Sequence, residues 1–317
     1  MRRWLIVGLL LVLSGCGGKN VPLNMPSSGL VERDRELYEN ARKALKKNRF
    51  TQARLELQTL LNTYEDSEFS AQAKYAYADS FYFESGHSNL LSAESEFRKF
   101  ITFFPDHELA PDAQMKVAMT HVKQLQKPDR DDTEARLAEY ELNVMIMDYP
   151  DSRLSDEAKE KLRGVQEILA ESLLGPANQY YMKRAYAAVV DRCNEILKKY
   201  PDFSGTDRVL FLLGETARKL NASDASTYYS RLVRDYPLSP LVKDSKKHLL
   251  ELQSAVPDPS PLALDRAKQQ KGDAKGGVVG LLSMGMVKSG GIEVSKETKA
   301  ASAKDPHGLL AIPGEQE

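Results

Sequence analysis

The segment from Ala138 to Ser152, AEYELNVMIMDYPDS, contains the clearest structural pattern of the chain. Counting back from Tyr149, small or apolar residues stand three, four, seven and eleven positions earlier. This spacing is one face of an α-helix. Pro150 ends that helix, because proline cannot donate the backbone hydrogen bond that the next turn requires.

The same pattern occurs five times, ending at Tyr64, Phe104, Tyr149, Tyr200 and Tyr236. The first copy departs from it only in having glutamate where the others have proline. The sets behind these aromatic residues are Ala53, Leu57, Leu60 and Leu61; Ala93, Phe97, Phe100 and Ile101; Ala138, Leu142, Met145 and Ile146; Val189, Cys193, Ile196 and Leu197; and Ala225, Tyr229, Leu232 and Val233. Five matches to one template indicate a repeat array rather than unrelated amphipathic helices.

A small residue twelve positions before a proline, as in Ala138 and Pro150, is similar to the second helix of a tetratricopeptide repeat. We therefore expect an all-α fold, a tetratricopeptide-repeat solenoid of five helix pairs plus a capping helix, over residues 32–254. The expected first helices are 36–46, 70–85, 110–126, 154–181 and 207–220, and the capping helix is 240–254. Pro176 is expected to kink or split the fourth, and the Asp or Ser after each proline is expected to cap the next helix.

Cys193 holds a template position that is Leu57, Phe97, Leu142 or Tyr229 in the other copies. We therefore expect a buried thiol that packs as a small apolar side chain. The chain has two cysteines in all, so a disulfide framework and a four-cysteine zinc site are excluded.

The N-terminus has the layout of a secretory signal peptide. Two arginines precede an apolar run from Trp4 to Leu13, which is shorter than the roughly 20 residues of a membrane-spanning helix. The run leads into Leu-Ser-Gly-Cys, ending at Gly15 and Cys16, which resembles the bacterial lipobox. That resemblance implies removal of residues 1–15 and acylation of Cys16. An ordinary signal peptide with a nearby cysteine is the alternative.

Both flanks of the repeat array are expected to lack stable structure. Residues 16–31 are rich in glycine, proline and serine and favour a flexible tether. Residues 255–317 contain no aromatic residue and favour a disordered Gly/Lys-rich tail. Within that tail the apolar segment 277–287 is either a partner-binding segment or a less polar stretch of linker.

Composition argues against several classes of function. The formal net charge of -1 gives no global positive field for nucleic acid. Five scattered histidines offer no metal-ligand spacing, and no catalytic motif, phosphate loop or dinucleotide fingerprint occurs. We therefore expect no catalytic residues, no metal, no cofactor and no enzymatic activity.

The presequence and repeats together resemble the BamD family of outer-membrane protein assembly factors. The insertion from Lys127 to Thr133, KPDRDDT, is the most specific point of similarity. From the residues alone it is either a solvated loop, in which Asp132 or Thr133 caps the following helix, or a partner contact.

The resemblance implies a lipid-anchored scaffold at the periplasmic face of the outer membrane, because Gly17 stands where an aspartate favours retention at the inner membrane. The implied partners are an Omp85-type barrel protein, other assembly lipoproteins and unfolded outer-membrane protein substrates. The fold alone leaves a second interpretation open, an adaptor for cell-wall, division or pilus-secretin assembly.

Two groups of residues are candidates for binding. A peptide groove on the first helices would use a carboxylate-binding cation and flat apolar rings. Its candidates are Arg42, Lys46, Arg49, Tyr75, Tyr77 and Tyr82. The alternative is that half of these pack within the repeats and the rest are solvated charges. Candidates for docking a partner near the C-terminal end are Arg208, Arg218 and Lys219.

Overall fold

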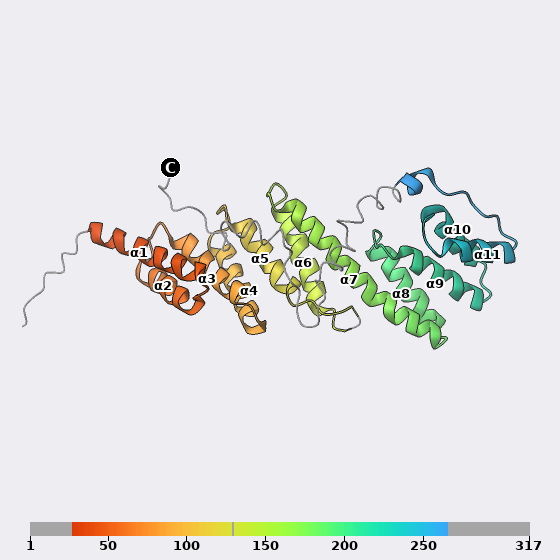
Figure 1. Ribbon diagram of the computed structural model, residues 1–317, viewed down its shortest axis with the longest axis horizontal. Coiled ribbons are helices and arrows are strands. Elements are labelled where there is room, and N and C mark those ends of the chain that lie inside the picture. The colour runs from red at the N-terminus through yellow and green to blue at the C-terminus, as the bar shows by residue number, and fades with distance from the viewer. Residues whose placement is uncertain (1–26, 129, 266–317) are drawn as a thin grey trace, which may run out of the picture.

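The computed structural model describes residues 27–128 and 130–265, and every regular element in those ranges is a helix. The helices are α1 (Ser27–Lys46), α2 (Phe50–Thr63), α3 (Ser70–Glu84), α4 (His87–Phe103), α5 (Ala110–Val122), α6 (Thr133–Asp148), α7 (Ser155–Met182), α8 (Tyr186–Lys199), α9 (Thr206–Lys219), α10 (Ala225–Asp235) and α11 (Val242–Glu251). They follow one another along a single elongated body (Figure 1). The predicted solenoid of five helix pairs and a capping helix is confirmed.

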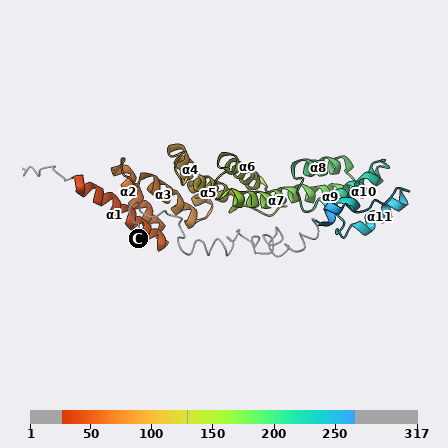
Figure 2. The ribbon, with the colours of Figure 1, turned by 90° about the horizontal axis from the view of Figure 1, so that it is seen from above.

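Each helix packs mainly against its neighbours in the chain, which is the contact pattern of a solenoid. Figure 2 shows the second helices α4, α6 and α8 along one long side and the first helices α7 and α9 on the other. The predicted signal peptide, residues 16–26 of the predicted tether and residues 266–317 lie outside the described residues. Helix α1 begins at Ser27, so residues 27–31 are helical where a flexible tether was predicted.

The template positions four, seven and eleven residues before each terminal aromatic form the spine of the core. All fifteen of these side chains are at most 1% exposed. Cys193 is one of them, and burial raises the pKa of its thiol to about 12. The prediction that it packs as an apolar side chain is confirmed.

The connections that lead into the first helices differ from the prediction. No residue at the N-cap position makes a side-chain capping hydrogen bond. Instead, in three of these turns a serine two residues earlier accepts the N-cap backbone N–H, as Ser152 Oγ does from Leu154 at 3.2 Å. The serine matters as predicted, but it stabilises the turn before the helix rather than the first helical turn.

Pro176 does not split α7, which is one continuous helix from Ser155 to Met182. Proline removes one intrahelical hydrogen bond, but buried residues on both sides of it hold the helix against the core. Leu173, Leu174 and Ala177 are all at most 7% exposed. Tertiary packing therefore outweighs the local cost of the proline.

The packed domain extends past residue 254, where the tail was expected to begin. The backbone N–H of Ser260 donates to the carbonyl oxygen of Arg234 at 2.9 Å, and Ala263 is 2% exposed. Val256 packs against the core formed by α9, α10 and α11. Residues 256–265 therefore belong to the folded body.

Candidate functional site

The six groove candidates separate into core residues and surface residues. Tyr75 is 1% exposed, with its ring centroid 5.4 Å from that of Phe97 and 5.6 Å from that of Phe100. Tyr82 is 6% exposed and also packs on Phe97. Both were candidates for contacting a peptide, but their burial makes them packing residues within the repeats.

The other four candidates remain accessible to different degrees. Tyr77 is half-buried on α3, and its hydroxyl accepts a hydrogen bond from Gln58 Nε2 of α2 at 3.1 Å. Arg42 is half-buried on α1, while Lys46 and Arg49 are exposed where α1 turns into α2. The three basic residues therefore lie at one edge of the first repeat.

A cluster that the sequence analysis did not identify lies between α3 and α5. The lysine–aromatic cluster consists of Asp79, Tyr82, Phe83, Lys116 and Lys123. Lys116 Nζ lies 4.3 Å from the ring centroid of Tyr82, 4.4 Å from that of Phe83 and 3.0 Å from Asp79 Oδ1. Lys123 Nζ lies 3.4 Å from the Tyr82 centroid and donates to the Tyr82 carbonyl oxygen at 3.0 Å.

The electrostatics of this cluster are unusual for a helix surface. Burial, followed by the positive charge of Lys116, lowers the pKa of Lys123 to about 8. The carboxylate of Asp79 is fully buried and pairs with the ammonium group of Lys116, so it offsets one of the two positive charges. Two ammonium groups beside one aromatic ring can attract a carboxylate, because the ring stabilises them without cancelling their positive charge. The sequence signal was the spacing of seven, which puts both lysines on one face of α5.

The insertion before α6 is a structured turn in the part that the structure describes. Asp131 Oδ1 accepts hydrogen bonds from the backbone N–H of Thr133 at 2.9 Å and from its hydroxyl at 2.6 Å. Asp132, one of the two residues expected to cap α6, stands at the N-cap position but makes no side-chain capping bond, and its carboxylate pairs with Arg136 at 2.7 and 3.0 Å. Asp129 lies outside the described residues, and a partner contact by this loop stays a prediction.

The three docking candidates also have different roles. Arg208 makes a two-pronged ion pair with Glu171 of α7, with N···O distances of 2.8 and 3.2 Å. Arg218 contacts His248 of α11 and lies 3.5 Å from both Glu215 and Glu251. Lys219 is exposed at the end of α9.

Arg218 is one member of a polar network that joins four helices near the C-terminal end. Glu215 of α9 accepts a 2.6 Å hydrogen bond from the Tyr229 hydroxyl of α10 and lies 3.2 Å from His248 Nε2. The Tyr181 hydroxyl of α7 donates to the same carboxylate at 3.5 Å. Burial and Glu215 together raise the pKa of Tyr229 well above its usual value. The main role of this network is therefore to hold α7, α9, α10 and α11 together.

Two general features complete the description of candidate sites. Within residues 27–128 and 130–265, no group of three or more His, Cys, Asp or Glu side chains is arranged to hold a metal ion. None of the helices described has both the length and the apolar character needed to cross a membrane.

Comparison with known proteins shows which family and which relatives the chain is similar to. Residues 32–232 match the family model YfiO, described as an outer membrane lipoprotein. Relatives named outer membrane protein assembly factor BamD occur in several bacteria. The one from Vibrio cholerae is 24% identical over 251 residues, which cover 75% of this chain and 100% of the relative. One from Xylella fastidiosa strain Temecula1 is 24% identical over 255 residues, covering 76% and 84%. One from Buchnera aphidicola is 25% identical over 210 residues, covering 62% and 83%.

Proposed function

The chain belongs to the outer membrane lipoprotein family whose model it matches, and we propose that it is a non-catalytic factor in outer-membrane protein assembly. The observation that carries the proposal is the similarity along the full length of a relative named as an assembly factor. A solenoid suits this work because it offers long surfaces for several partners at once.

In this proposal the protein is anchored by lipid at Cys16 and works at the periplasmic face of the outer membrane. The lipobox-like sequence before Cys16 supports the anchor, since two or more acyl chains hold a protein on a membrane almost permanently. A Cys16→Ser variant is expected to leave the membrane fraction. Full retention of this variant after washing with high salt would contradict the anchor.

The first helices of the N-terminal half receive unfolded barrel substrates in this proposal. Tyr77, Arg42, Lys46 and Arg49 are accessible there, and the lysine–aromatic cluster adds positive charge beside aromatic rings. A peptide with a free C-terminal carboxylate is expected to bind more tightly than the same peptide with an amide end. A Lys116→Gln and Lys123→Gln double variant should reduce that preference, and an unchanged preference would remove the cluster from the proposal.

The C-terminal repeats dock an Omp85-type barrel protein in this proposal. Lys219 is exposed, whereas Arg208 and Arg218 are already paired with carboxylates of the chain itself. Lys219→Glu is therefore expected to weaken the contact more than Lys183→Glu, a matched change at the end of the preceding first helix. Equal effects of the two variants would contradict docking at Lys219.

The decisive experiment is an affinity pull-down of the full-length chain from its native membranes in mild detergent, with every co-purified protein identified by mass spectrometry. Stoichiometric recovery of an Omp85-type barrel protein and other lipoproteins is the expected result. Recovery of cell-wall, division or secretin components in their place would contradict the proposal and favour an adaptor role.

A further inference from the structure

Helix α6 has an apolar stripe on the side that faces away from the core. Leu137, Tyr140 and Met147 are 40%, 63% and 77% exposed, and Val144 between them is half-buried. These positions are separated by three, four and three residues, so they form one continuous row along the helix. The opposite face of α6 carries the buried template residues, so this helix is apolar on two sides.

The stripe is specific to α6, as a comparison at the same register shows. Its residues stand twelve, nine, five and two positions before the terminal aromatic. At those positions the other second helices carry Gln52, Leu55, Thr59 and Asn62 in α2; Ser92, Ser95, Lys99 and Thr102 in α4; Ala188, Asp191, Glu195 and Lys198 in α8; and Asp224, Thr227, Arg231 and Arg234 in α10. Apart from Leu55 and Ala188, all of these are polar.

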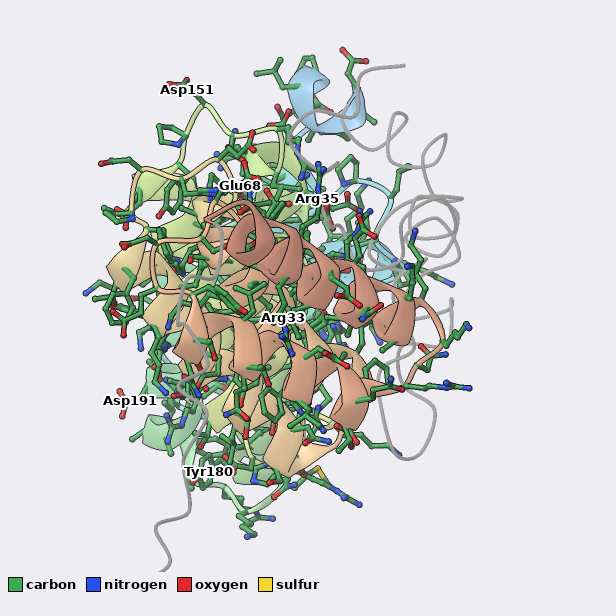
Figure 3. All side chains as sticks on the ribbon, turned by 90° about the vertical axis from the view of Figure 1, so that its left-hand side faces the viewer. Arg33, Arg35, Glu68, Asp151, Tyr180 and Asp191 are labelled. Atoms are coloured by element: carbon green, nitrogen blue, oxygen red, sulfur yellow. The ribbon has the colours of Figure 1, made fainter. Side chains whose placement is uncertain are left out.

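This register points away from the body of the solenoid. In Figure 3, which looks along the solenoid from the N-terminal side, Asp191 of α8 lies at the edge of the molecule with its carboxylate directed outward. Asp191 is the equivalent of Tyr140. Packing of the repeats therefore does not require an apolar residue at this register. The four apolar residues along α6 need another explanation.

The spacing of the stripe indicates the kind of partner. Apolar residues that alternate three and four apart form the seam along which one helix packs on another. An extended peptide would instead match alternate residues of a strand edge, which α6 does not offer. We propose that the stripe of Leu137, Tyr140, Val144 and Met147 docks an amphipathic helix of another protein. This surface lies on the second helices, apart from the surface proposed for substrates.

Two other occupants fit the observations less well. A stable interface between two copies of the chain would use about 20–30 residues on each side, whereas the stripe is one helix wide and four residues long. The chain's own apolar segment 277–287 would have to reach α6 from residue 265. Figure 2 shows residues 261–265 on the long side opposite α4, α6 and α8.

The experiment places a photo-reactive benzoylphenylalanine at position 140 of the full-length chain in its native membranes. Matched controls carry the same group at position 191 in α8 and position 227 in α10, which share the register. The expected result is an adduct at 140, absent or roughly tenfold weaker at the controls, consistent with a contact worth about 1.4 kcal/mol. Mass spectrometry of the adduct should identify a peptide with apolar residues three and four apart.

A second variant tests whether the stripe itself binds. Val144→Asp puts a charge in the middle of the seam and should lower the adduct yield from position 140 about tenfold. Met147→Lys, at a site 77% exposed, serves the same purpose if the first variant does not fold. The proposal is overturned by equal yields at positions 140 and 191, or by an unchanged yield in the folded variant. It is also overturned by an adduct to the chain itself, to lipid, or to a peptide without the helical pattern.

Discussion

The two ends of the solenoid are held together in different ways. In the N-terminal half, large aromatic side chains pack on one another, as in the stack of Tyr38 on Phe69 and the edge contacts of Tyr75 with Phe97 and Phe100. At the C-terminal end, the apolar cluster of α9, α10 and α11 has only five buried members, and the Glu215 network runs beside it.

One helical template can therefore be stabilised by two kinds of contact. Apolar packing is non-directional and scales with buried area, so it tolerates small shifts of a helix. Charged hydrogen bonds fix distances and angles, so they hold a helix in one place. We therefore expect the N-terminal core to set the overall stability and the C-terminal network to set the position of α11.

Phe97→Ala should have the largest effect. The side chain is fully buried and contacts the rings of Tyr75 and Tyr82, so its loss should reduce the free energy of unfolding by about 3–5 kcal/mol. Urea denaturation of the two proteins measures the change. Phe103→Ala is the control, because Phe103 is 66% exposed and its removal should cost less than about 1 kcal/mol. Similar losses in both variants would contradict an aromatic core in this half.

Gly214→Ala tests how tightly the C-terminal helices pack. A Cβ atom at Gly214 would lie 2.6 Å from Cε1 of Tyr229, so alanine forces α9 and α10 apart. The expected loss is about 1–3 kcal/mol in the free energy of unfolding. Gly175→Ala on α7 is the comparison, since apart from its chain neighbours nothing lies within 4 Å of its Cβ. There, contact of the new Cβ with Pro176 offsets the higher helix propensity of alanine, so the free energy of unfolding should change by less than about 1 kcal/mol. Equal losses at both sites would contradict tight packing at Gly214.

Glu215→Ala should mainly release α11. It removes the acceptor of the Tyr229 hydroxyl and a partner of Arg218 and His248, at a cost of about 1–2 kcal/mol. Amide hydrogen exchange should quicken in α11 and stay unchanged in α3. The control is Glu195→Ala, because Glu195 pairs only along α8, with Arg192 and Lys199, at its surface. Equally faster exchange in all helices would show that the Glu215 network stabilises the whole domain rather than α11 in particular.

Most of the fold could be predicted from the sequence because the repeats are redundant. One helix alone does not show whether a given position faces the core, but the equivalent positions of five helices do. Cys193 is an example. The cysteine alone does not indicate whether it faces the core, but the four large apolar residues at the equivalent positions do. The sequence predicted a helix over 154–181 but left open whether Pro176 would kink or split it, because the packing around Pro176 comes from residues distant in the sequence.

The candidate sites could be predicted only in part. Aromatic residues on α3 were visible in the sequence, but the side on which each one lies depends on the crossing of α3 with α4. The sequence therefore left open which of the candidates pack within the repeats, as Tyr75 and Tyr82 do. Glu141 was missed for a similar reason. It is 2% exposed within α6 and is satisfied by Arg98 of α4 and Gln114 of α5, both at 2.8 Å. Such polar contacts depend on long-range geometry that periodicity does not contain.

The last prediction concerns Lys123, whose ammonium group lies on the Tyr82 ring in the N-terminal half. The folded-state pKa of Lys123 is about 8, below the value of about 10.4 for a free lysine. Between these values the unfolded chain binds more protons than the folded one, so this lysine makes stability rise with pH. Below pH 8 the lysine is charged in both states, and the cost of burying the charge is fully present.

Thermal unfolding of the wild type and Lys123→Met from pH 7 to pH 10 measures this contribution. The free energy of unfolding of the wild type should increase relative to that of the variant as the pH rises above 8, because only the wild type sheds the buried charge. Lys198→Met, on the exposed surface of α8, controls for the loss of one positive charge. A difference between wild type and Lys123→Met that stays constant with pH, or moves the other way, would mean that Lys123 is not held in a desolvated site on the Tyr82 ring. Lys123 would then contribute no charged contact to the N-terminal half.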